Sequence, residues 1–369
     1  MQKPDEIRMR EALALARKGY GLTSPNPMVG ALLVKGSVVI GQGWHRCAGG
    51  PHAEINALNQ AQRRDYNVKG STLYVTLEPC STTGKTPPCT EAIIAAGIVR
   101  VVVAAKDPNP AHAGRAFRVL RRSGIEVVKN ILADEAMELN AAFNHWIVNG
   151  TPMVTVKAAM TLDGKIATEH GESKWITGEA ARREGMHLRK GADAILVGIE
   201  TILADDPSLT VCASRGGDRL RRIILDSKAR TPVTANVVSD ESAALTTVVV
   251  AKGAPARRVM ALRKRVNVIE APARKGRVDL RWLLKRLGRE EVTDLLVEGG
   301  GEVNASFFEN NLVQRVAFFY APKVLGGKHA RPVVGGKGAA NLKQAPKLTN
   351  VQWRRLGPDL LLTARVAGD

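Results

Sequence analysis

The sequence predicts a two-domain α/β protein. Its 369 residues exceed a typical domain of roughly 150 residues, which favours two domains or three small ones. Short apolar runs alternate with segments of helical periodicity along both halves of the chain. The turn residues Asn149-Gly150-Thr151-Pro152 interrupt this alternation near the middle. We therefore expect one domain at residues 1–149 and a second at 150–369.

In the first half, the pattern predicts a helix, a hairpin and then alternating strands and helices. Apolar residues recur on one face at 5–18, and Gly19 follows where a helix cap belongs. Short strands at 31–34 and 38–40 are joined by Lys35-Gly36 as a hairpin. The later elements are a helix after Pro51, strands at 72–77, 99–105 and 125–128, helices at about 90–96 and 115–122, and one long helix to Trp146.

The second half continues the alternation of strands and helices. Its expected strands lie at 154–157, 194–197, 222–225, 247–251, 266–269, 294–297 and 316–320. Neither half contains G-x-G-x-x-G or G-x-x-x-x-G-K-[ST]. A standard Rossmann or P-loop assignment therefore lacks its fingerprint.

The composition is that of a globular, enzyme-sized protein with excess positive charge. Charged residues are 24% and hydrophobic residues 44%, which excludes disordered and collagen-like chains. Lys and Arg number 54 against 35 Asp and Glu, a net charge of +19, yet the basic residues are scattered and aromatics are only 4%. This favours attraction of anionic small molecules over nucleic-acid binding. Because no apolar run approaches ~20 residues and no signal peptide is recognisable, we expect a cytoplasmic protein with reduced cysteines and no membrane partner.

A His/Cys/Cys constellation in the first half predicts a catalytic metal site. His52 opens a helix, Cys80 follows a strand and Cys89 precedes another helix. One imidazole and two thiolates suit tetrahedral Zn²⁺ and leave a fourth position for water, whose pKa the metal can lower towards ~7. Glu54 fits the proton shuttle of the zinc-deaminase signature, His-x-Glu with Pro-Cys further on. The alternative, a helix-capping histidine and two small core cysteines, does not explain their order along the chain.

Further motifs carry a resemblance to a known family. They are PNPxVG at 25–30, HAE at 52–54, TLEPC at 76–80, TPPC at 86–89, DPNP at 107–110, KAA at 157–159, LDGK at 162–165, SKWIT at 173–177, ADDPxLT at 204–210 and VEGG at 297–300. Over roughly residues 5–335 the sequence resembles the bifunctional riboflavin-biosynthesis deaminase/reductase family, often called RibD or RibG.

The resemblance implies a cytidine-deaminase-like α/β/α sandwich followed by a dihydrofolate-reductase-like α/β domain. The first would hydrolyse the 2-amino group of 2,5-diamino-6-(5-phosphoribosylamino)pyrimidin-4(3H)-one with zinc-activated water. The second would reduce the ribosyl chain of 5-amino-6-(5-phosphoribosylamino)uracil to ribityl with NADPH. The implied cofactors are one Zn²⁺ per chain and NADPH, the substrates are phosphorylated pyrimidines, and we expect a homo-oligomer.

The resemblance also assigns candidate contacts by position. Candidate substrate contacts are Asn26, His45, Lys85 and Asn109 in the deaminase and Lys157, Ser173, Arg189, Leu209, Cys212 and Glu298 in the reductase. Candidate NADPH contacts are Ala159, Trp175, Thr201, Asp205, Ser227, Gly300, Gly301, Glu302, Val303, Asn304, Ala305 and Ser306. From the residues alone, the glycines after residue 298 form either a pyrophosphate cradle or a flexible turn. Arg189 alone fits a solvated helix face, and Trp175 alone fits a packed core ring.

Two positions depart from the family pattern. Thr82-Thr83 stand where many relatives carry His after Cys-Ser, and a hydroxyl cannot become a cation. Cys212 stands where relatives tend to have Arg, and a thiol cannot bind phosphate as a guanidinium does, so Arg215 is a candidate replacement.

Other functions stay open at this point. They are a deaminase whose second domain has lost reduction, a paralogue that feeds a related pteridine-like product, a nucleic-acid deaminase that uses the +19 charge, and a non-catalytic scaffold.

Overall fold

The chain folds into two compact units, Met1–Gly150 and Thr151–Asp369, each of which is described by itself. The computed structural model describes residues 3–82, 87–211 and 219–367. Within these residues, no helix combines the length and the apolar character needed to cross a membrane.

The described part of the first unit is built on a five-stranded sheet in the order β2-β1-β3-β4-β5. β1 runs antiparallel to β2 and β3, whereas β3, β4 and β5 are parallel. The strands are β1 (Gly30–Lys35), β2 (Val38–Trp44), β3 (Thr72–Leu77), β4 (Arg100–Ala105) and β5 (Glu126–Val128). All residues of β3 and β4 after the first of each strand are buried, because helices cover both of their faces.

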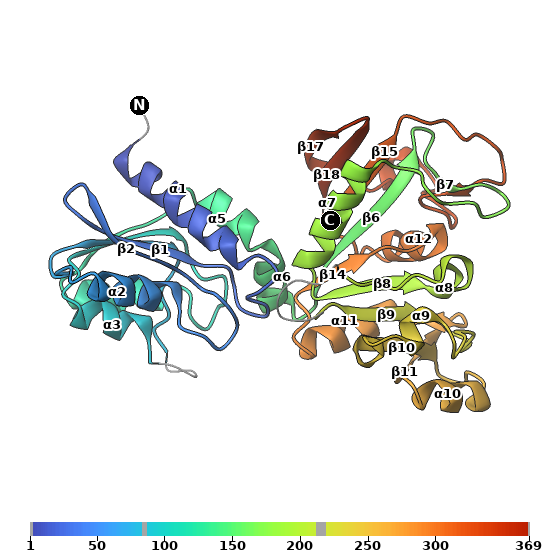
Figure 1. Ribbon diagram of the computed structural model, residues 1–369, viewed down its shortest axis with the longest axis horizontal. Coiled ribbons are helices and arrows are strands. Elements are labelled where there is room, and N and C mark those ends of the chain that lie inside the picture. Colours follow the sequence, from blue (N-terminus) through green and yellow to red (C-terminus); the bar gives the residue numbers. More distant parts are fainter. Residues whose placement is uncertain (1–2, 83–86, 212–218, 368–369) are drawn as a thin grey trace. The chain divides into compact units, whose positions relative to one another are not determined.

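Helices lie on both faces of this sheet (Figure 1). They are α1 (Pro4–Ala16), the 3-10 turn Arg17–Gly19, α2 (Ala53–Arg63), α3 (Cys89–Ala95), α4 (Arg115–Arg122), α5 (Ala133–Leu139) and α6 (Ala141–Asn149). Neighbouring residues of β1 show the two faces: Leu32 packs with Met9 of α1, and Leu33 packs with Ala57 of α2. The unit is therefore an α/β/α sandwich, which confirms the predicted layers.

The predicted long helix to Trp146 is wrong in one respect. It is divided into α5 and α6 at Asn140, whose backbone is not helical at φ −108° and ψ 26°. The Asn140 side chain accepts from the Met28 N–H at 2.8 Å and donates to the Met28 carbonyl at 2.9 Å. The chain bends there because this buried amide binds a distant loop instead of continuing the helix.

The described part of the second unit is built on a nine-stranded sheet in the order β11-β10-β9-β8-β14-β6-β15-β18-β17. The strands from β11 to β15 are parallel, and β18 and β17 are added antiparallel at one edge. The strands are β6 (Met153–Thr161), β8 (Ala194–Gly198), β9 (Arg221–Leu225), β10 (Thr246–Ala251), β11 (Asn267–Ala271), β14 (Asp294–Val297), β15 (Arg315–Ala321), β17 (Leu348–Leu356) and β18 (Asp359–Val366). Short pairs form between β7 (Lys165–Ala167) and β16 (Arg331–Pro332), and between β12 (Ala273–Arg274) and β13 (Arg277–Val278).

Helices also cover both faces of the larger sheet (Figure 1). They are α7 (Glu179–Gly191), α8 (Ile199–Asp205), α9 (Asn236–Ser239), α10 (Ala256–Arg263), α11 (Leu280–Arg289), α12 (Gly301–Glu309) and the 3-10 turns Ala243–Leu245 and Leu342–Gln344. Leu196 of β8 packs in the same core as Leu283 of α11 and Phe307 of α12. Its neighbour Ile195 packs on the other face with Ile202 of α8. All seven strands expected from the sequence are present, whereas β17 and β18 were not predicted.

Candidate active sites

Three elements bring the predicted metal ligands together in the first unit. His52 is the N-cap residue of α2, Cys80 lies in the loop after β3, and Cys89 is the first residue of α3. The His52 Nδ1 atom lies 3.2 Å from Cys89 Sγ and 3.5 Å from Cys80 Sγ. All three ligand atoms lie within 4.8 Å of one another. The donor set and its spacing therefore fit one tetrahedral Zn²⁺ with an open fourth position.

The local fold prepares one cysteine as a thiolate. The Cys89 N–H donates to Cys80 Sγ at 3.2 Å, and the N–H of Thr90 donates to the Cys80 carbonyl at 3.2 Å. Hydrogen bonding from the Cys89 thiol and from His52 lowers the pKa of Cys80 to about 4. Because the thiolate is the ligating form, this lowering of the pKa favours metal binding by Cys80.

Glu54 lies beside the three ligands but is not one of them. It occupies the first turn of α2 and is 3% exposed. Burial raises the pKa of its carboxyl, while the nearby His52 acts in the opposite direction. A carboxyl group next to an open metal position can exchange protons with a water bound there.

His45 and Asn26, two predicted substrate contacts, lie against each other. The Asn26 Nδ2 atom is 3.1 Å from His45 Nε2, and His45 Nδ1 is 3.2 Å from the Pro51 carbonyl oxygen. Burial, with a contribution from His52, lowers the pKa of His45. A neutral ring that donates from Nδ1 and accepts at Nε2 satisfies both partners. The imidazoles of His45 and His52 stand edge to face, with centroids 5.5 Å apart.

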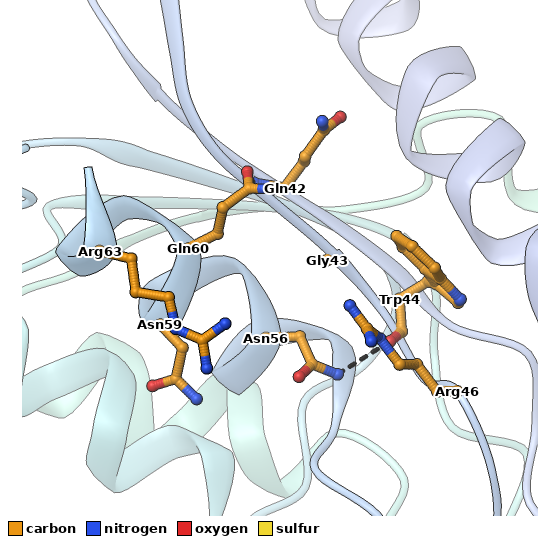
Figure 2. A pocket seen from close by; sticks show the side chains of 8 residues that line it. All are labelled: Gln42, Gly43, Trp44, Arg46, Asn56, Asn59, Gln60 and Arg63. Atoms are coloured by element: carbon orange, nitrogen blue, oxygen red, sulfur yellow. Dashed lines mark hydrogen bonds between the residues drawn. The ribbon is translucent and has the colours of Figure 1, made fainter.

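Asn56 fixes the loop that leads from His45 to His52. Its side-chain nitrogen donates to the Trp44 carbonyl at 2.9 Å and to the Pro51 carbonyl at 3.1 Å. Figure 2 shows the first of these bonds within a small polar pocket of about 90 Å³ between β2 and α2. The pocket is lined by Gln42, Gly43, Trp44, Arg46, Asn56, Asn59, Gln60 and Arg63 and by none of the metal ligands.

Of the other two predicted deaminase contacts, only Asn109 lies within the described residues. Asn109 lies between β4 and α4, where its N–H donates to Asp107 Oδ1 at 2.8 Å and its own Oδ1 accepts from the Ala111 N–H at 3.0 Å. Lys85 and Thr83 lie outside the described residues.

In the second unit, an ionic cluster joins three predicted substrate contacts. Glu298, directly after β14, binds Lys157 of β6 at 3.3 Å and Arg189 of α7 at 2.8 and 2.9 Å. All three side chains are largely buried, with 11–18% of their surface exposed. Burial favours the neutral acid, but Lys157 and Arg189 outweigh it and lower the pKa of Glu298 to about 2. One carboxylate thus faces two cations, and the cluster keeps a net positive charge.

Taken alone, Arg189 fitted a solvated helix face and Trp175 a packed core ring, and the structure contradicts both interpretations. Arg189 is not a solvated helix residue, since it is 18% exposed and also donates to the Thr210 carbonyl at 3.3 Å. Trp175 is not a core ring, since it is 67% exposed. The Arg182 guanidinium lies over that ring, 4.7 Å from its centroid. The sequence did not identify Arg182 as a contact of Trp175, because no sequence pattern shows which arginine of α7 stacks on that ring.

Several predicted cofactor contacts gather at the carboxyl ends of the parallel strands. Thr201 lies on α8 after β8, Ser227 follows β9, and Gly300 follows β14. Asp205, at the end of α8, accepts from Ser173 Oγ at 3.0 Å and so joins the 168–178 loop to this edge. Ligands of open parallel sheets bind at this edge.

The glycine segment after β14 makes a close turn into α12. A Cβ atom on Gly299 would lie 2.6 Å from Val303, and one on Gly301 would lie 2.5 Å from the Pro332 carbonyl, whereas Gly300 faces open space. The backbone at the start of α12 can therefore be approached at Gly300.

Several other predicted substrate and cofactor contacts of the second unit are buried or partly buried. Asn304 and Ala305 are buried, and Asn304 donates to the Val333 carbonyl at 2.8 Å. Leu209 is 3% exposed with φ +53°, and Ala159 is partly buried beside the Phe319 cluster. Cys212 and Arg215 lie outside the described residues.

Comparisons with known proteins find a matching family for each of the two units. Residues 2–105 match the model of the cytidine and deoxycytidylate deaminase zinc-binding region, and residues 152–362 match the RibD C-terminal domain. A riboflavin biosynthesis protein RibD from Bacillus amyloliquefaciens is 43% identical over 98% of this chain and 96% of its own length. The chain belongs to the RibD family.

Relatives of known structure extend the RibD match to three dimensions. RibD of Acinetobacter baumannii is 36% identical with a TM-score of 0.87, and 99% of each chain is covered. A deaminase/reductase of Thermotoga maritima is 34% identical with a TM-score of 0.84, covering 98% of this chain and 99% of its own. Among relatives compared by sequence alone, the Escherichia coli RibD is 37% identical over 97% of this chain and 98% of its own length. The protein is thus a bifunctional RibD-type deaminase/reductase of riboflavin biosynthesis, with a cytidine-deaminase-like domain followed by a dihydrofolate-reductase-like domain.

Proposed function

We propose that the first unit deaminates 2,5-diamino-6-(5-phosphoribosylamino)pyrimidin-4(3H)-one and that the second reduces the ribosyl chain of the product with NADPH. The Thermotoga relative is described as the corresponding phosphoribosylaminopyrimidine deaminase and phosphoribosylaminouracil reductase. The observation that carries the proposal is the meeting of His52, Cys80 and Cys89 with the buried Glu54.

For deamination, one Zn²⁺ would be held by His52, Cys80 and Cys89. When bound, zinc supplies an activated water at neutral pH. Glu54 would accept a proton from the attacking water and deliver it to the departing amino group, so that a C–O bond replaces a C–N bond and ammonia leaves. Asn26 and His45 would orient the pyrimidine, since their amide and imidazole groups lie together beside His52.

For reduction, NADPH supplies the hydride. The open backbone at Gly300 would receive its pyrophosphate, and the exposed Trp175 ring would stack on one of its bases. Lys157 and Arg189 would bind the substrate, because Glu298 holds both cations in a fixed position while leaving a net positive charge. If Arg215 does not replace the guanidinium missing at Cys212, Arg189 is the next candidate for the substrate phosphate.

The remaining expectations belong to the same proposal. Cys47, Cys80 and Cys89 are free thiols, and thiols persist in a reducing compartment, which supports a cytoplasmic location. Eight of the nine residues of edge strand β17 are exposed, and an exposed edge of this kind supports self-association into a homo-oligomer.

The test supplies zinc-loaded enzyme with the diaminopyrimidine substrate. We expect ammonia release without NADPH and, after NADPH is added, oxidation of one NADPH for each ammonia released. Ammonia release without NADPH oxidation would instead indicate a deaminase whose second domain has lost reduction. Deamination of single-stranded nucleic acid with steep salt dependence would favour the nucleic-acid alternative.

A further inference from the structure

A buried carboxylate holds one loop of the first unit through backbone amides alone. Glu78 lies directly after β3 and is 5% exposed. Its Oε2 accepts from the N–H groups of Asp107 at 3.2 Å and Gly114 at 2.9 Å, and its Oε1 accepts from the N–H of Ala116 at 3.0 Å. These three bonds tie residues 107–116 to the end of β3.

The loop held by Glu78 lies next to the chain segment that carries a metal ligand. β3 and β4 are parallel neighbours, and Leu77 pairs with Ala105. The Glu78 N–H continues this pairing by donating to the Ala105 carbonyl at 2.9 Å. Residues 78–80 and residues 106–114 therefore leave the same edge of the sheet side by side.

We propose that Glu78 is a positioning residue of the deaminase, which places Asn109 by fixing the 107–116 loop. The proposal rests on the proposed function and on the expectation, implied by the family resemblance, that Asn109 contacts the substrate. Glu78 acts on Asn109 through Asp107, whose N–H binds Glu78 and whose carboxylate accepts from the Asn109 N–H at 2.8 Å. Glu78 itself touches neither substrate nor metal ligand in this account.

Only a carboxylate of this length satisfies all three amides. In Glu78→Gln one oxygen becomes an NH₂ group, which cannot accept from an N–H, so at least one of the three bonds is lost. In Glu78→Asp the charge stays but the side chain is one methylene shorter. The loop should therefore loosen in both variants, whereas the three metal ligands are unchanged.

The test measures ammonia release, zinc content and amide hydrogen exchange of Glu78→Gln. We expect the KM for the diaminopyrimidine to rise at least about tenfold, with kcat changed less than about threefold, and exchange at residues 107–116 to accelerate. Zinc content and reduction of the deaminated intermediate should stay unchanged. The matched control is Glu126→Gln, a 63% exposed carboxylate on β5 paired with Arg100, which should alter neither KM nor exchange in the loop.

Each outcome decides the proposal. Faster exchange in the loop with an unchanged KM would overturn the positioning role, and unchanged exchange would show that Glu78 does not hold the loop. If Glu78→Gln loses zinc, the same measurements on Glu78→Asp decide in its place. A zinc-loaded wild type that releases no ammonia would refute the proposed function, whereas the exchange measurement would still test the hold of Glu78 on the loop.

Discussion

Substitution of Glu298 by Gln should destabilise the second unit, because it leaves Lys157 and Arg189 facing each other without a counter-charge. The pKa of Glu298 is about 2 instead of the ordinary 4.5, a difference that corresponds to about 3 kcal/mol of favourable interaction with the ionised form. Removal of one partner of a buried pair costs ~3–5 kcal/mol. Since 11–18% of each side chain is exposed, we expect a loss of about 2–4 kcal/mol.

The assay follows amide exchange of β6 and β14 in increasing urea, which reports on the second unit itself. The matched control is Glu302→Gln, whose carboxylate pairs with Arg277 but is 68% exposed, and it should cost less than about 1 kcal/mol. The depressed pKa also sets the pH dependence: the contribution of Glu298 is complete above pH 4.5 and is lost as pH falls towards 2. Equal losses in Glu298→Gln and Glu302→Gln would refute the assigned cluster.

Three further predictions concern other sites. Burial and the neighbouring Asp193 raise the pKa of Asp294 from 3.8 to about 8, so wild-type stability should fall as pH rises between these values. The variant Asp294→Asn should therefore raise Tm more at pH 8 than at pH 5. An equal rise in Tm at both pH values would contradict this. Trp175→Ala should raise the KM for NADPH roughly five- to hundredfold without affecting ammonia release, and an unchanged KM would remove Trp175 from the cofactor site. Cys80→Ser should lose the bound zinc measured by metal analysis, and a full complement of zinc in this variant would overturn the ligand assignment.

Much of the fold could be predicted because local signals agree with it. The apolar runs of β3, β4 and β8 are buried on both faces, so short stretches of sequence already identify them. β17 lacks such a signal, since it is an edge strand with eight of its nine residues exposed. The strand β18 contains the apolar run Leu360–Leu362, which was not recognised as a strand. The break at Asn140 depends on its bonds to Met28, an interaction between distant residues that periodicity does not record.

The two candidate sites differ in how much of each could be predicted from the sequence. The metal ligands follow a short signature, and the structure brings all three together. The reductase residues were assigned by resemblance, and their arrangement depends on the sheet: Lys157 meets Glu298 because β6 and β14 pair in register at Val156 and Val297. Glu78 and Asn56 hold nearby loops by hydrogen bonds to backbone atoms. Such bonds leave no pattern of side chains in the sequence.

The central claim is that one chain carries two separate sites, with Glu54 serving only the first. The most direct measurement is Glu54→Gln in both half-reactions, with the already deaminated intermediate supplied for reduction. The account predicts full zinc content, ammonia release reduced at least about a hundredfold and reduction of the intermediate at the wild-type rate. Loss of both activities together, or ammonia release at the wild-type rate, would contradict it.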